Sequence, residues 1–165
     1  MKVPVDSAQT RMKTDLGYLV LAGIASAGFL VSVVCHLMGW LHIEPPWGKS
    51  VFVLHVGILV LWFPLVIFAN RTMPMPKDRR GNLEHLLAEL PKWVRAAVAV
   101  LFAYALLNFA YFLYCTSQYP KNKVPFYIEL RGFSGHWMMF YGIAALGFVA
   151  LGRLARNRKD HEPIA

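Results

Sequence analysis

The distribution of apolar residues along the chain predicts four membrane-spanning helices. Long apolar runs with no acidic and almost no basic residues occupy residues 16–41, 51–69, 93–114 and 134–154. A helix needs about 20 such residues to cross ~30 Å of hydrocarbon at ~1.5 Å per residue. A soluble four-helix bundle would instead carry charged residues along the outer face of each helix. The pattern therefore predicts an all-α, polytopic integral membrane protein, a four-helix transmembrane bundle forming one domain over residues 1–165.

The segments between the predicted spans differ in character. The middle loop, residues 70–92, contains leucines at helical spacing, which predicts a short amphipathic helix over residues 82–90 that lies on the membrane surface. The third loop, residues 115–133, is rich in aromatic residues. At this length it exceeds the usual connection, which favours packing across the end of the bundle or contact with a partner.

A secretory signal peptide is the competing interpretation of the first apolar run. Basic residues precede the run, and Ala25-Ser26-Ala27 resembles the small-residue site at which a signal peptide is cleaved. The run continues to Trp40, however, far past the length of a signal-peptide core. We therefore expect an uncleaved first span.

The net charge of +8 is best explained by topology. Thirteen of the 17 Lys and Arg residues lie in the N-terminal tail, the middle loop with the start of the third span, and the C-terminal tail. The positive-inside rule then predicts a multi-pass protein of the cell membrane with both termini in the cytoplasm. Attraction to the lipid bilayer and its anionic headgroups accounts for the remaining basic character, so we expect no nucleic-acid partner.

Two features of the spans suggest contacts between helices. The first span carries small residues four apart, namely Ala22 with Ser26, Gly23 with Ala27, and Gly28 with Ser32. This spacing allows close helix approach, although Gly and Ala are also generally tolerated in membrane helices. In the third span, Asn108 needs a hydrogen-bond partner in hydrocarbon and should therefore face another helix.

Histidines and cysteines gather near the predicted outer ends of the spans, and these are the candidate site residues. Antiparallel threading brings His36, His55, His136 and Cys115 to a similar depth, where they could surround one space in a compact bundle. Two facing histidines could ligate a haem b, while His36, His55, His136 and Cys115 could hold a transition metal such as zinc or copper. Arg131 is the candidate for binding a carboxylate or phosphate of a cofactor.

The alternative interpretation is that these histidines are interfacial or packing residues. No pair of them has the tight spacing of a known metal motif. Cys35 and Cys115 could form a disulfide in an oxidising compartment, but free thiols are favoured because the first and third spans would be diagonal in a simple ring. Ser134 is a candidate helix N-cap that would put His136 in the first turn of the fourth span.

No catalytic motif for nucleotide binding, hydrolysis or phosphoryl transfer occurs in the chain. We therefore expect a small, non-catalytic subunit or partner-binding element of a membrane assembly, with a membrane-protein partner or further copies of itself. The alternative is a membrane redox protein that binds haem or a transition metal through its histidines. An oligomeric pore ranks last, because polar residues do not line one face of any predicted span.

Overall fold

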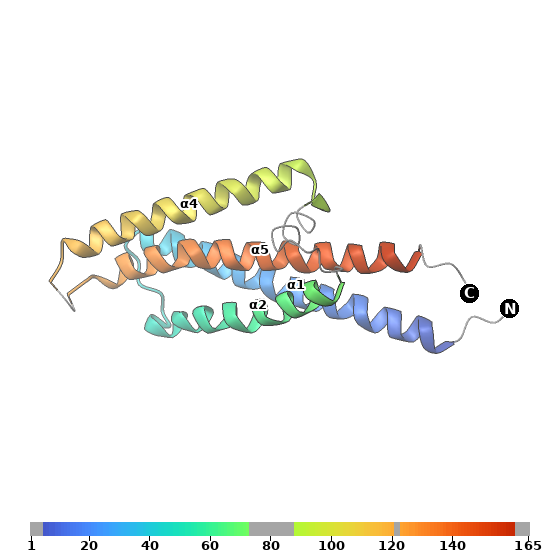
Figure 1. The fold of residues 1–165 in the computed structure, drawn as a ribbon. Coiled ribbons are helices and arrows are strands. Elements are labelled where there is room, and N and C mark those ends of the chain that lie inside the picture. The colour runs from blue at the N-terminus through green and yellow to red at the C-terminus, as the bar shows by residue number, and fades with distance from the viewer. Residues whose placement is uncertain (1–4, 73–87, 121–122, 161–165) are drawn as a thin grey trace.

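The computed structural model describes residues 5–72, 88–120 and 123–160, and the regular structure in this part of the chain is entirely helical. Four long helices and one short 3-10 helix follow one another along the sequence (Figure 1). They are α1 (Val5–Trp40), η1 (Gly48–Phe52), α2 (Val53–Thr72), α4 (Lys92–Ser117) and α5 (Phe126–Asp160). The long helices run alternately up and down, so that α1 begins and α5 ends at the same end of the bundle.

Each long helix contains a stretch that can cross a membrane. By length and composition, these stretches are Leu16–Trp40, Gly48–Thr72, Lys92–Ser117 and Phe126–Asn157. Even α2, the shortest of the four long helices with 20 residues, spans about 30 Å, which matches the hydrocarbon thickness. The predicted all-α, four-helix transmembrane bundle is confirmed, and the fold is compatible with a multi-pass membrane protein.

The boundaries of the fourth helix differ from the prediction. α5 begins at Phe126 rather than near residue 134, and α4 continues to Ser117, so the predicted loop 115–133 shrinks to residues 118–125. Pro125 precedes the first turn, and Glu129 lies in it, where its charge complements the helix dipole. The prediction that Ser134 is an N-cap is therefore wrong, because Ser134 and His136 lie well inside α5.

Two other predicted segments, the N-terminal tail and the surface helix, also need to be compared with the structure. α1 extends back to Val5 and includes residues that the sequence pattern left in a polar tail. The predicted surface helix over 82–90 lies outside the described residues except for its last three positions.

α5 is the central helix of the bundle. Helices α1, α2 and α4 each pack against it, and its span is the most buried of the four, whereas that of α4 is the least buried. Figure 1 shows α2 and α4 on opposite sides of α5. α4 diverges from α5 toward the N-terminal end of α4. The largest fully buried side chains also come from α5, among them Trp137 and Phe148.

Small residues on α1 allow it to approach α5 closely. Ala22, Ala25 and Ser32 are buried along one face, and a Cβ atom added at Gly39 would lie 2.8 Å from the backbone nitrogen of Arg131. Close approach matters here because lipid tails are as apolar as the helix surfaces, so association depends on van der Waals contact and hydrogen bonds. The close-approach interpretation thus holds for this face of α1.

Tyr141 joins α5 to two neighbouring helices. Its ring and hydroxyl group occupy the space left by Gly28 of α1 and Gly57 of α2, where an added Cβ atom would come within 2.4 Å and 2.2 Å of Tyr141, respectively. Its hydroxyl group donates a hydrogen bond of 2.8 Å to the carbonyl oxygen of Leu54. The two glycines therefore leave room for the Tyr141 side chain, which contacts both α1 and α2 from α5.

Candidate functional site

A hydrogen-bond network around His36 connects three helices. His36 Nδ1 lies 2.9 Å from Ser134 Oγ in α5, and Trp40 Nε1 donates a 3.0 Å hydrogen bond to His36 Nε2. The hydroxyl group of Tyr104 in α4 also bonds to this Nε2. Inside a bundle of apolar helices, such contacts satisfy groups that water cannot reach.

The direction of the hydrogen bonds assigns the protonation of His36. Ser134 Oγ donates its proton to the carbonyl oxygen of Arg131 at 3.2 Å, so it accepts from His36 Nδ1. The indole of Trp40 can only donate, so His36 Nε2 is an acceptor. His36 is therefore a neutral imidazole with its proton on Nδ1, and both ring nitrogens are engaged.

Asn108 supplies a second polar link between α4 and α5. Its Nδ2 atom donates to the carbonyl oxygens of Arg131 at 3.0 Å and of Gly132 at 3.2 Å. Gly135 leaves room for the amide, because a Cβ atom there would lie 2.2 Å from Asn108 Nδ2. The prediction that Asn108 faces another helix is confirmed.

Arg131 lies beside this network, and its side chain is only 5% exposed. The guanidinium carbon lies 4.4 Å from the ring centroid of Trp40 and 4.5 Å from that of Tyr111, which are cation–π distances. Its Nη2 atom donates to Cys115 Sγ at 3.4 Å. Cys115 thus contacts Arg131, and both Cys115 and the buried Cys35 are free thiols.

His55 and His136 form a separate pair between α2 and α5. Their ring centroids are 5.4 Å apart in an edge-to-face arrangement. The buried Trp137 donates a 3.0 Å hydrogen bond to His55 Nδ1, which makes this nitrogen an acceptor. His136 is otherwise surrounded by aromatic rings, including those of Phe109 and Phe133.

The prediction that His36, His55 and His136 surround one space is therefore wrong. His36 contacts α5 at Ser134, which is two residues and about 200° around the helix from His136. Cys115 also lies apart from the histidine pair, at Arg131. Within the described part of the chain, no group of three or more His, Cys, Asp or Glu side chains could hold a metal ion.

The sequence interpretation missed the aromatic partners of the polar residues. Trp40 and His36 are four residues apart, a spacing that places them on the same face of a helix and offered one usable signal. The contacts of His36 with Tyr104 and of His55 with Trp137 carry no such signal, because they join positions far apart in the chain.

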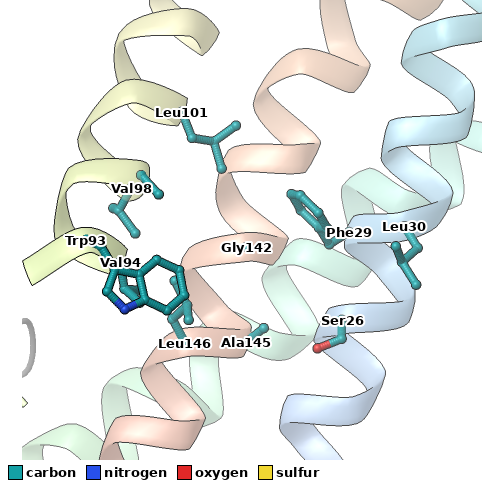
Figure 2. Close-up of a pocket in the computed structure, with 11 residues that line it drawn as sticks. Ser26, Phe29, Leu30, Trp93, Val94, Val98, Leu101, Gly142, Ala145 and Leu146 are labelled. Carbon is teal, nitrogen blue, oxygen red and sulfur yellow. The ribbon is translucent and has the colours of Figure 1, made fainter. Parts of the chain in front are cut away.

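A lateral groove lies at the other half of the bundle, where α4 diverges from α5. It has a volume of about 410 Å³, and its walls come from α1, α4 and α5 (Figure 2). Figure 2 shows Ser26 and Phe29 of α1 on one side of the groove and Val94 and Val98 of α4 on the other, with Gly142 of α5 between them. The Ser26 hydroxyl group donates to the carbonyl oxygen of Ala22 at 2.8 Å, so it is already satisfied. The groove therefore suits an apolar occupant.

Comparison with known protein families gives no match, and neither do the comparisons with curated proteins and with solved structures.

A double-mutant cycle tests the link between His36 and Ser134. We expect His36→Phe and Ser134→Ala each to destabilise the protein, and the two effects to couple by about 1 kcal/mol because either change alone already removes the hydrogen bond between the two side chains. Unfolding of the single and double variants in detergent, followed by circular dichroism, measures this coupling. Strictly additive effects would contradict a direct hydrogen bond between the two side chains.

Proposed function

We propose that the protein is a non-catalytic, partner-binding subunit of a membrane assembly, and that its groove between α1 and α4 receives a transmembrane helix of another protein. The observation that carries this proposal is the surroundings of Gly23. Gly28, Gly39, Gly57, Gly132 and Gly135 are each filled by a neighbouring helix, with an atom within 3 Å of an added Cβ, whereas Gly23 has nothing within 4 Å.

Gly23 and Ala27 form a small-residue surface beside the groove. They are four residues apart, and both are exposed within the chain. Leu30, which lines the groove, is seven residues from Gly23 and hence lies on the same face of α1. A lipid chain gains little from a glycine, but a helix can bring its backbone close to one, so this surface favours a helix as the occupant.

Site-specific photo-crosslinking in native membranes tests the groove. A photoreactive amino acid at Leu30 should give an adduct with another membrane protein, whereas the same group at the exposed Val60 of α2 should not. Gly23→Leu should reduce the Leu30 adduct several-fold by blocking close approach, without unfolding the chain, because the site is open.

Three outcomes would count against this proposal. They are the absence of a protein adduct at Leu30, an adduct that Gly23→Leu leaves unchanged, and an adduct that contains two copies of this chain. The last outcome would assign the groove to self-association.

We also propose that the chain lies in the cell membrane with both termini in the cytoplasm. The support is the excess of Lys and Arg in the two tails and the middle loop. A reporter that is active only outside the cytoplasm should therefore be inactive when fused after residue 165 or within 73–87, and active when inserted between Tyr119 and Pro125. The opposite pattern would contradict this orientation.

The alternative function, a redox protein with haem b or a transition metal, has weaker support. His55 and His136 are adjacent, but their rings are in direct contact, whereas the two axial ligands of a haem stand on opposite faces of the porphyrin. His36 has both nitrogens engaged in hydrogen bonds. Among the residues that the structure describes, two histidines are thus available together, while a structural zinc site takes four ligands.

Absorption spectroscopy and metal analysis of the protein purified in mild detergent test this alternative. We expect no Soret band and no stoichiometric metal, since the described side chains do not provide a full set of ligands. A bound metal that is lost in both His55→Ala and His136→Ala would instead establish the histidine pair as a metal site.

A further inference from the structure

A polar pocket of about 260 Å³ lies at the end of the bundle where α4 ends and α5 begins. Arg131 and Cys115 form part of its wall, and other hydrogen-bonding side chains provide most of the rest. These are His42, Tyr111, Tyr114, Gln118, Tyr119 and Tyr127. None of the described residues that line the pocket is acidic.

The charge of Arg131 has no counter-ion among the described residues. Arg131 is only 5% exposed to solvent. Its guanidinium group contacts the sulfur of Cys115 and the rings of Trp40 and Tyr111. A guanidinium group carries five N–H donors, and Cys115 accepts from one nitrogen only. A buried cation that is solvated by aromatic faces still favours an anion within reach of its free donors.

The remaining donors of the pocket suit a phosphate group. Tyr119 lies in the connection between α4 and α5, where its hydrogen bond with Tyr127 raises the pKa of its phenol above the ordinary value of 10. Both phenols are protonated at neutral pH, and the bond between them uses one of their two protons, so the pair keeps one O–H group that can donate to a ligand. Phosphate oxygens point in several directions and can accept from donors on different walls, whereas a carboxylate has two oxygens in one plane.

The position of the pocket favours the same ligand. Its residues lie around the end of α4 at Ser117, where the membrane-spanning stretch of this helix ends. This is the depth at which lipid headgroups are found. Tyrosines, which are common at this level of a membrane, make up much of the wall.

We propose that this pocket binds a phosphate group, with Arg131 as its principal ligand and the tyrosines and Gln118 as additional donors. The phosphate can belong to a phospholipid headgroup or to a free phosphate. This proposal is independent of the partner-binding groove, which lies between α1 and α4 at the other half of the bundle.

Cys115 provides a built-in reporter of pocket occupancy. The chain has two cysteines, so Cys35→Ala leaves Cys115 as the only thiol. In maltoside detergent, phosphatidylglycerol should slow the reaction of Cys115 with N-ethylmaleimide several-fold and saturably, because the headgroup occupies the pocket. Diacylglycerol, which has the same tails but no phosphate, should not slow it. Protection by inorganic phosphate as well would show that a free phosphate is sufficient.

Arg131→Gln in the same background should abolish the protection. If this variant does not fold, Tyr127→Phe and Gln118→Leu remove peripheral donors and should raise the half-protecting lipid concentration several-fold. The proposal is overturned if neither phosphatidylglycerol nor phosphate protects Cys115, if diacylglycerol protects it equally, or if protection persists in a folded Arg131→Gln variant.

Discussion

Inside hydrocarbon a polar side chain keeps its hydrogen bonds only where other parts of the protein supply the partners, and the end of this bundle is organised around that constraint. His36 of α1 bonds to Ser134 of α5 and Tyr104 of α4. Asn108 of α4 bonds to backbone oxygens of α5. Because each polar group has its partner on a different helix, the same bonds that satisfy these groups also fix how α1, α4 and α5 lie relative to one another.

Glycines make this arrangement possible. Gly39 lets the backbone of α1 reach that of α5 beside Arg131, and Gly135 makes room for the amide of Asn108. Hydrogen bonds require donor and acceptor within about 3 Å, and a Cβ atom at either position would separate the helices that carry them. Gly132 and Gly135, which lie close to His136 in the sequence, thus serve helix packing, although glycines clustered beside a histidine can also indicate a binding or catalytic motif.

Two regions stand apart from this close packing. Around Gly23 the surface of α1 is open, and the adjacent groove is apolar. At the opposite half, Arg131 brings a positive charge into a pocket lined largely by tyrosines. The first region offers an apolar shape, and the second offers a charge that no residue in the described part of the chain neutralises, so they suit different kinds of ligand.

The sequence alone determined the class of fold, because the length and composition of apolar runs directly reflect the thickness of a membrane. It also predicted that Asn108 needs a partner, since the cost of an unpaired amide does not depend on which helix supplies the bond. The grouping of His36, His55 and His136 failed for a physical reason. Similar depth does not fix direction around a helix, and Ser134 and His136 face opposite sides of α5. Only the tertiary structure decided that Arg131 meets Trp40, Tyr111 and Cys115, because the rotation and close approach of packed helices bring together residues that sequence spacing does not relate.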